Sequence, residues 1–319
     1  MNSKIEHIEY YLPKKYETLK DLKKDNPSWN IKKIYNTTGI NKRFIASNEN
    51  IVDMAEKSCQ KLIKKNKIKN IDFLILVTQS SPTGIPTSAN ILHQKLKLDQ
   101  KCLCFDINQG CSGFIYALAV AASLIKANIC KSGIVVCSEK YSKYIGKNDS
   151  SCRPIFSDAS SSVLVKKSKK SKIKGFVLGS DGNGYKNLIV PSKNMKIRNK
   201  ILKKNKIYMD GSNVFLFTLN KVKECFNQIL KKSKLEKNKV DYYIFHQASK
   251  FVLENLVRKI GIDKKKNIVN LDKVGNTVSA SIPIALKMAL QKKKVKKNSK
   301  VLLLGFGVGY SWGGCIIEC

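Results

Sequence analysis

The feature that most constrains this fold is a helix–strand unit that occurs once in each half of the chain. The helix and strand expected over 52–78 recur over 218–247, and the pair Ile71-Asp72 has its counterpart in Val240-Asp241, 169 positions later. In both places an apolar run follows the aspartate. Repeated α/β units predict two similar halves, which we bound at 1–168 and 169–319.

Further elements follow the same order in both halves. Alternating or continuous apolar residues predict strands at 4–11, 71–77, 102–105, 133–137 and 301–304. Helical spacing predicts helices at 50–65, 88–97 and 281–291, together with the Ala-rich segment 115–127. The runs 71–77 and 102–105 are apolar enough for strands covered on both faces. This alternation predicts a mostly parallel sheet in each half, with functional residues at the carboxyl ends of the strands.

Cys111 lies at a polar corner just before the Ala-rich segment. Gly110 and Gly113 flank it, and glycine permits unusual backbone angles and close approach of other segments. A thiol at the N-terminus of a buried helix lies at the positive end of the helix dipole, which lowers its pKa and favours the thiolate. The pattern is typical of a nucleophile. It fits a small buried apolar residue equally well.

Two polar residues of the second half occupy comparable positions. His246 directly follows the expected strand 242–245, and Asn276 lies in a turn before a helix, where Cys111 lies in the first half. If the halves pack about a pseudo-two-fold axis, the three side chains meet in an apolar pocket. A thiolate, an imidazole and an amide N–H together suit thioester formation and enolate stabilisation. Each residue alone also has a structural interpretation: His246 as a strand-end histidine and Asn276 as a helix N-cap.

The charge of the chain is strongly positive, at +37. Most of it comes from lysine, and aromatic residues are not interleaved with the basic runs, so we do not expect nucleic-acid binding. A small acidic protein or a phosphate-bearing substrate is the better partner for this charge.

Composition also limits the location and the metal content. No segment approaches the ~20 uninterrupted apolar residues of a membrane span, and residues 1–7 lack the apolar core of a signal peptide. The ten cysteines contain no C-x-x-C pair, and only three histidines occur. We therefore expect a cytoplasmic protein with reduced thiols, no metal site and no membrane association.

The motifs, in their order along the chain, resemble the ketoacyl-(acyl carrier protein) synthase III family. They are the segment 106–114 around Cys111, His246-Gln247-Ala248, Gly275-Asn276-Thr277 and the glycine-rich segment 305–313. The resemblance covers essentially the whole chain. It implies a duplicated α/β, thiolase-like fold in five layers, α-β-α-β-α, and a homodimer.

The resemblance also implies roles for individual residues. Cys111 would accept an acyl group from a CoA or carrier-protein thioester, with no further cofactor. His246 and Asn276 would bind malonyl-(acyl carrier protein), favour loss of CO₂ and stabilise the enolate, which attacks the acyl group to give a 3-oxoacyl product. The backbone N–H groups of Cys111 and Val308 match the oxyanion hole, and Phe306 and Gly307 belong to the same pocket.

Several positions depart from the family pattern. Lys33, Thr37 and Ser150 stand where members that use acetyl-CoA carry the Trp and Arg residues that hold the CoA adenine, and Arg153 lies three positions past the last of these. Lys250 follows the His-Gln-Ala motif in place of the usual residues and is the expected carrier-protein contact. Ile85 is the expected acyl-pocket residue, reaching either its own pocket or that of a dimer partner.

Each competing function would require different residues in the sequence. The nearest alternative is a relative that transfers the acyl group from Cys111 to an oxygen or amine acceptor without condensation. A thiolase would need a second catalytic cysteine, for which Cys315 is a weak candidate. A hydroxymethylglutaryl-type synthase would need a glutamate acid/base, and no glutamate stands out in the sequence.

Overall fold

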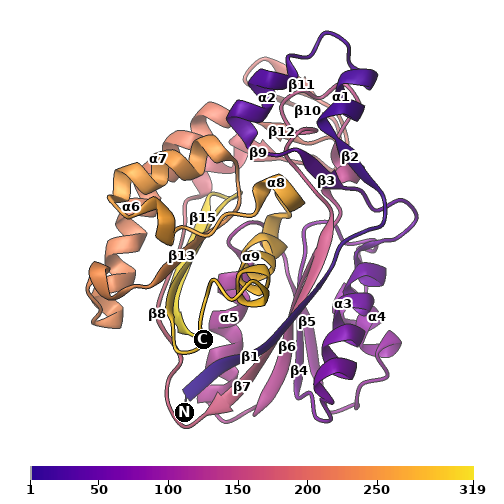
Figure 1. Cartoon of the computed structure of the whole chain (residues 1–319). Helices are drawn as coiled ribbons and strands as arrows, with labels where there is room; N and C mark the ends of the chain where they lie inside the picture. The colour runs from indigo at the N-terminus through magenta and orange to yellow at the C-terminus, as the bar shows by residue number, and fades with distance from the viewer. Residues whose placement is uncertain (1) are drawn as a thin grey trace.

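The computed structural model describes residues 2–319 and consists of five layers, α-β-α-β-α (Figure 1). Two sheets face each other, and α5 (Gly113–Lys126) and α9 (Ser281–Gln291) lie between them. On the outside, α3 (Ile51–Asn66) and α4 (Ser88–Lys95) cover the first sheet, and α6 (Gly211–Ser233) and α7 (Lys250–Ile260) cover the second. The α/β fold and its layers are therefore as predicted.

The first sheet has five strands in the order β1-β7-β6-β4-β5. They are β1 (Asn2–Tyr11), β7 (Ala159–Ser168), β6 (Ser132–Glu139), β4 (Phe73–Val77) and β5 (Leu103–Ile107). β4 pairs in parallel with β5 and β6, whereas β7 pairs antiparallel with β6 and with β1.

The second sheet has the order β13-β14-β15-β8. Its strands are β13 (Tyr242–Phe245), β14 (Lys300–Gly307), β15 (Ser311–Glu318) and β8 (Ile173–Ser180). The strand order is the same in both sheets when β13 is aligned with β4. In that alignment β14, β15 and β8 take the places of β6, β7 and β1. The counterpart of β5 is reduced to a single parallel bridge between Tyr243 and Asn267. The boundary that we placed at 168/169 lies in the connection between β7 and β8.

The prediction of mostly parallel sheets was wrong. Only β13 and β14 run parallel in the second sheet, because the short glycine-containing turn after Gly307 returns the chain directly and makes β14 and β15 an antiparallel hairpin. A parallel pair would need a long crossover connection there. The prediction of full burial for the strand at 102–105 was also wrong. β5 lies at the sheet edge, and Leu103 is 42% exposed.

The remaining helices and strands are short. They are β2 (Tyr16–Thr18), α1 (Leu19–Asp25), α2 (Ile31–Thr38), β3 (Lys42–Phe44), β9 (Leu188–Ile189), β10 (Met195–Ile197), β11 (Lys200–Leu202), β12 (Tyr208–Met209) and α8 (Leu271–Val274), with 3₁₀ turns at 141–144, 182–187, 237–239, 264–266 and 278–280. Over residues 2–319, none of the helices combines the length and apolarity of a membrane span.

One hydrophobic core joins the two halves. Ala117 and Ala121 of α5, Ala285 of α9, Ile75 of β4 and Leu303 of β14 belong to the same buried cluster. The middle helices can be buried on all sides because their apolar residues are not confined to one stripe. Neither half therefore has a complete core of its own, and the strand ends of both halves are held at a fixed separation.

Glu9 of β1 is a buried carboxylate that holds three lysines. It is 1% exposed, and the Nζ atoms of Lys65 and Lys287 lie 2.9 Å from its Oε1, while that of Lys61 lies 3.1 Å from Oε2. Burial alone would raise the pKa of Glu9, but the hydrogen bonds from the three lysines lower it from 4.5 to about 2. Because Lys287 belongs to α9 and Lys61 and Lys65 to α3, this cluster joins three layers.

We predict that Glu9→Gln lowers the free energy of unfolding at neutral pH. The stabilisation by a carboxylate with a depressed pKa is complete above pH 4.5 and is lost as the pH falls toward 2. Urea unfolding should therefore show a large difference between wild type and variant at pH 7 and a smaller one at pH 3. Glu6→Gln on the same strand, where the carboxylate is exposed enough to pair with Lys4 at the surface, is the matched control. An equal difference at both pH values would contradict the prediction.

Candidate active site

The corner that carries Cys111 is shaped by two glycines. A Cβ atom at Gly110 would lie 2.5 Å from Val308 Cγ1, and one at Gly113 would lie 2.5 Å from Val77 Cγ1. Both positions therefore exclude a side chain, as the prediction of close approach required. Cys111 is placed two residues before α5, at the meeting point of the two sheets.

The Cys111 thiol is buried against the second half of the chain. A Cβ atom at Gly307 would lie 2.9 Å from Cys111 Sγ, so the bare backbone of β14 leaves the space that the sulfur occupies. The backbone N–H groups of Cys111 and Val308 are close enough to the thiol to lower its pKa. These are the two donors expected for the oxyanion hole.

The prediction of a lowered thiol pKa was wrong. Burial, and secondarily the charge of Glu139, raise the pKa of Cys111 to about 12, and the two backbone N–H groups offset only part of this. Desolvation disfavours the thiolate more than the two amides favour it. The thiol is therefore neutral at physiological pH.

His246 follows β13 and enters the same buried region from the second sheet. Its Nδ1 lies 2.8 Å from the Ser281 hydroxyl, and its ring contacts the ring of Phe306 edge-on, with centroids 5.6 Å apart. Burial lowers the pKa of His246 to about 3, so the imidazole is neutral at physiological pH. No pattern in the sequence analysis indicated that Ser281 contacts His246.

Asn276 has its amide orientation fixed by the backbone. The Val278 N–H donates to Asn276 Oδ1 at 2.9 Å, so Nδ2 points away from it, toward His246 Nε2 at 3.5 Å. The oxygen thus stabilises the local turn, but the expected helix N-cap role was wrong, because Thr277 and not Asn276 is the N-cap of the following 3₁₀ turn. The nitrogen remains a donor toward the site.

One cavity of about 430 Å³ brings Cys111, His246 and Asn276 together, with Phe306 and Gly307 beside them. The remaining wall is largely apolar and runs outward to Thr37, Phe215 and Phe251. Val308 contributes its backbone to the site, while its side chain lines a neighbouring cavity. Three side chains far apart in the sequence therefore lie in one buried space.

Two predicted residues lie outside this cavity. Lys250, the first residue of α7, is exposed and lines a neighbouring surface cleft together with Lys273, Lys292 and Lys294. Ile85 is 91% exposed and is not among the lining residues of either cavity near Cys111. The chain by itself does not bring Ile85 to an acyl pocket.

Glu139 is a buried acid that the sequence did not single out. It ends β6, accepts hydrogen bonds from the hydroxyls of Ser80 and Ser279, both at 2.9 Å, and accepts one from the Gln79 N–H at 3.1 Å. Burial raises its pKa to about 7. Glu139 is not among the described residues that line the Cys111 cavity. Glu139 therefore acts on the thiol through its charge and not by direct contact with a bound molecule.

We predict that Glu139→Gln speeds alkylation of Cys111 by iodoacetamide at pH 8. The wild-type carboxylate is ionised above its pKa of about 7 and raises the thiol pKa, so removing the charge lowers the thiol pKa. Each unit of decrease raises the thiolate fraction about tenfold. Peptide mass spectrometry resolves the adduct on Cys111, and Glu9→Gln is a control that removes a distant buried carboxylate. A rate unchanged or slower in Glu139→Gln would contradict this assignment.

Among the residues described, no cluster of three His, Cys, Asp or Glu side chains is arranged to hold a metal ion. Cys315 is buried in β15, and burial raises its pKa well above the ordinary value. It is likewise absent from the described lining of the Cys111 cavity, so the structure does not bring a second cysteine to Cys111.

Comparison with known proteins agrees with this architecture. Residues 105–182 match the family model "3-Oxoacyl-[acyl-carrier-protein (ACP)] synthase III", and residues 230–319 match its C-terminal model. Beta-ketoacyl-[acyl-carrier-protein] synthase III of Clostridium novyi is 34% identical, with 99% of each chain covered. The enzyme of the same name from Streptococcus pyogenes is 31% identical, again with 99% of each chain covered.

Solved structures give the same result. A 2.1 Å crystal structure of a 3-oxoacyl-(acyl-carrier-protein) synthase III has a TM-score of 0.95 and 31% identity, and covers both chains completely. The synthase III of Aquifex aeolicus has a TM-score of 0.91 and 30% identity, also over both whole chains. The fold and the Cys-His-Asn cavity define an enzyme of the thiolase superfamily. Within it, the chain belongs to the 3-oxoacyl-[acyl-carrier-protein] synthase III family.

Proposed function

We propose that this enzyme condenses an acyl thioester with malonyl-(acyl carrier protein), with loss of CO₂, to give a 3-oxoacyl-(acyl carrier protein) for fatty-acid or related acyl biosynthesis. The observation that carries the proposal is the convergence of the Cys111 thiol, His246 Nε2 and Asn276 Nδ2 in one buried cavity. Family membership supports the same reaction.

The first half of the reaction loads the acyl group onto Cys111. The thiol is neutral, so its proton must leave as sulfur attacks, and the neutral His246 imidazole in the same cavity is the available base. The N–H groups of Cys111 and Val308 stabilise the tetrahedral oxyanion. The thiol of CoA or of the carrier protein then leaves with the proton. Ser281 supports either tautomer of His246, because a hydroxyl both donates and accepts.

The second half forms the carbon–carbon bond. Asn276 Nδ2 and His246 Nε2 lie 3.5 Å apart, and in the tautomer that carries the His246 proton on Nε2 both nitrogens can donate to one malonyl thioester oxygen. The electrons of the breaking C–CO₂ bond enter the enolate, whose carbon attacks the acyl carbonyl. The Cys111 thiolate departs and takes up a proton from water, which restores the neutral thiol. The Phe306 ring beside His246 excludes water and keeps the local dielectric low, which strengthens both hydrogen bonds.

Two substitutions separate the halves of the reaction. Cys111→Ala should abolish acylation, seen by intact mass after incubation with acyl thioesters. Asn276→Ala should leave acylation intact and lower release of CO₂ from malonyl-(acyl carrier protein) by about 10²-fold, as expected for loss of one preorganised donor. Turnover retained in Cys111→Ala would refute the nucleophile. Acylation without CO₂ release in the wild type, with an active carrier protein, would favour transfer to an oxygen or amine acceptor instead.

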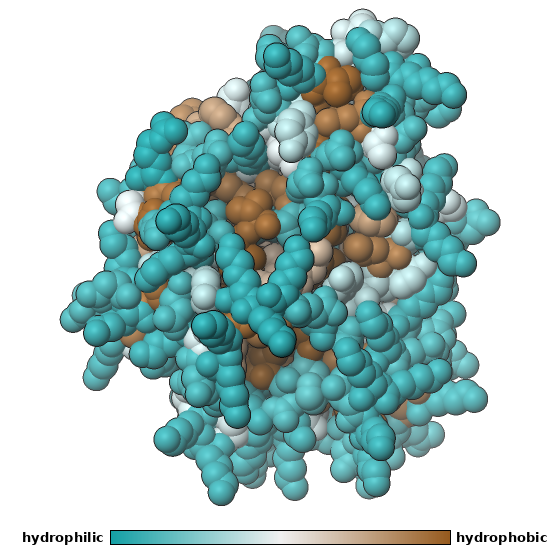
Figure 2. Space-filling view, viewed as in Figure 1, coloured by the Kyte–Doolittle hydropathy of each residue, from teal (hydrophilic) through white to brown (hydrophobic). Residues whose placement is uncertain are grey.

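We propose that the carrier protein docks at the cavity mouth beside Lys250. Lys250 lies next to Ser249 and Phe251, which line the cavity, and Lys273, Lys292 and Lys294 line the adjoining cleft. Figure 2 shows hydrophilic side chains over most of this face, with apolar atoms in the hollows between them. A positive rim around an apolar opening suits an acidic protein that delivers a thioester arm.

We predict that Lys250→Glu raises the KM for malonyl-(acyl carrier protein) about tenfold at low salt, with a small change in kcat. A rim charge acts mainly on association, and salt screens it, so the difference should shrink at high ionic strength. Lys69→Glu, an exposed substitution that reverses the same charge away from this cleft, is the control. An unchanged KM in Lys250→Glu would place the carrier protein elsewhere.

The position of Arg153 supports a carrier-protein donor over CoA. Arg153 is 4% exposed, pairs with Glu17 at 3.1 Å and Asp25 at 2.5 Å, and donates to the Lys147 carbonyl at 2.7 Å. It is fully engaged within the protein and does not replace the adenine-binding arginine of relatives that use acetyl-CoA. A carrier protein needs no adenine clamp.

We further propose a homodimer in the cytoplasm. β5 is an edge strand with unpaired backbone groups on one side and Leu103 partly exposed, which is a surface suited to pairing with a second copy. In such a dimer the exposed Ile85 would reach the acyl pocket of the partner. Ten free cysteines suit a reducing compartment.

A further inference from the structure

The direction of the Asn276 amide depends on one strained turn. The Val278 N–H donates to Asn276 Oδ1 at 2.9 Å, and this bond turns Nδ2 toward His246. Val278 is β-branched, yet its φ is +53°, a backbone conformation that is unfavourable for such a residue. Val278 is also completely buried, so water does not hold its N–H in place. The turn keeps this conformation because neighbouring groups of the protein hold it.

Ser279, the next residue, is bonded to the first half of the chain. Its hydroxyl donates to Glu139 Oε1 at 2.9 Å, and both residues are completely buried. Glu139 ends β6, whereas Ser279 belongs to the 3₁₀ turn at 278–280 that follows Asn276. Leaving a buried carboxyl oxygen without its donor is unfavourable, so this bond fixes the strained turn to the first sheet.

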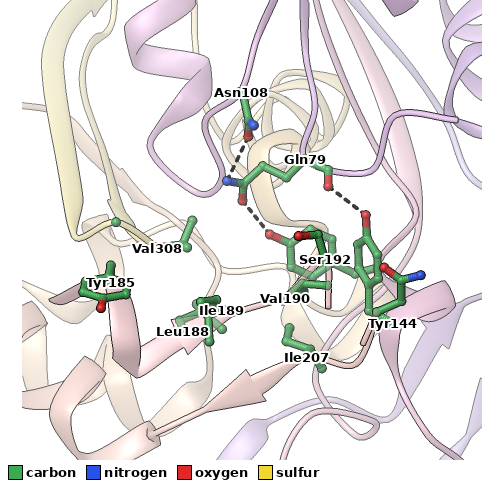
Figure 3. Close-up of a pocket in the computed structure, with 13 residues that line it drawn as sticks. Gln79, Asn108, Tyr144, Tyr185, Leu188, Ile189, Val190, Ser192, Ile207 and Val308 are labelled. Atoms are coloured by element: carbon green, nitrogen blue, oxygen red, sulfur yellow. Dashed lines mark hydrogen bonds between the residues drawn. The ribbon is translucent and has the colours of Figure 1, made fainter. Parts of the chain in front are cut away.

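The other oxygen of Glu139 is held by the loop that follows β4. Oε2 accepts from the Ser80 hydroxyl at 2.9 Å and from the Gln79 N–H at 3.1 Å. Gln79 is held in turn, since its Nε2 donates to Asn108 at 3.2 Å and its carbonyl accepts from the Tyr144 hydroxyl at 3.0 Å (Figure 3). The carboxyl group therefore has a fixed position, from which Oε1 receives the bond from the second half of the chain.

The two malonyl-binding side chains differ in what holds them. The His246 ring has its own partner, because Nδ1 lies 2.8 Å from the Ser281 hydroxyl. The Asn276 amide has the bond from Val278 at 2.9 Å and a longer contact, 3.4 Å, from Nδ2 to the Ala248 carbonyl. A shift of the turn would therefore misdirect Asn276 more than His246.

We propose that Glu139 and Ser279 are positioning residues for decarboxylation, since their hydrogen bond lets the first half of the chain set the direction of the Asn276 amide. The inference rests on the proposed function and adds two residues to its second step. Neither residue is among the described residues that line the Cys111 cavity, so both act through Asn276 and not by contact with the substrate.

Ser279→Ala tests the bond while Glu139 keeps its charge. The kcat for release of CO₂ from malonyl-(acyl carrier protein) should fall about tenfold with little change in KM, because a misdirected donor loses part of the ~10²-fold effect of a missing one. Acylation of Cys111, followed by intact mass, should keep the wild-type rate, which also shows that the variant is folded. Ser279→Cys keeps a similar volume and a weak donor, and should give a smaller loss.

Ser162→Ala is the matched control, because Ser162 is also completely buried and donates through its hydroxyl, to the Ser58 carbonyl at 2.8 Å. Its CO₂ release should equal that of wild type. A second measurement adds Ser279→Ala to Asn276→Ala. Since Ser279 acts through Asn276, the double variant should release CO₂ no more slowly than Asn276→Ala alone.

Two results would overturn the positioning role alone. They are CO₂ release unchanged in both Ser279 variants, and a loss from Ser279→Ala that is the same with and without the Asn276 amide. A wild type that acylates Cys111 but releases no CO₂ would overturn the proposed function itself, and with it the step that these residues serve.

Discussion

Burial of one shared helical layer between two sheets is the constraint on which this structure depends. α5 and α9 have apolar side chains directed at both sheets, and a single hydrophobic cluster crosses between the halves. The carboxyl end of β13 is thereby fixed opposite the start of α5. Cys111 and His246 meet because the core leaves the two halves one way to pack, and the site is as rigid as that core.

The same burial sets the charge state of the site. It raises the pKa of Cys111 to about 12 and lowers that of His246 to about 3, so both groups rest in their neutral forms. A neutral imidazole can take the thiol proton in one step and serve as a hydrogen-bond donor in the next. An imidazolium beside a malonyl carboxylate would hold the carboxylate in place and oppose loss of CO₂.

Much of this was predictable from the sequence, and the failures have physical causes. Strong periodicity predicted α3 and α9, and the repeat with its motifs predicted that His246 and Asn276 lie near Cys111. The antiparallel β14–β15 pair depends on a short turn, and the exposure of β5 depends on strand order, neither of which an apolar run reveals. The sign of the thiol pKa and the role of Glu139 depend on burial and on contacts between distant segments. The local spacing of residues in the sequence does not indicate burial or long-range contacts.

The burial of the thiols also bears on how an electrophile could distinguish them. Cys104 and Cys319 are partly exposed and the other eight, Cys111 included, are buried. Among the described cysteines, Cys111 is the one that lines the cavity shared with His246 and Asn276. Selective covalent inhibition would therefore come from the fit of the electrophile to that channel. An electrophile selected for reactivity alone would react first with the partly exposed thiols of Cys104 and Cys319.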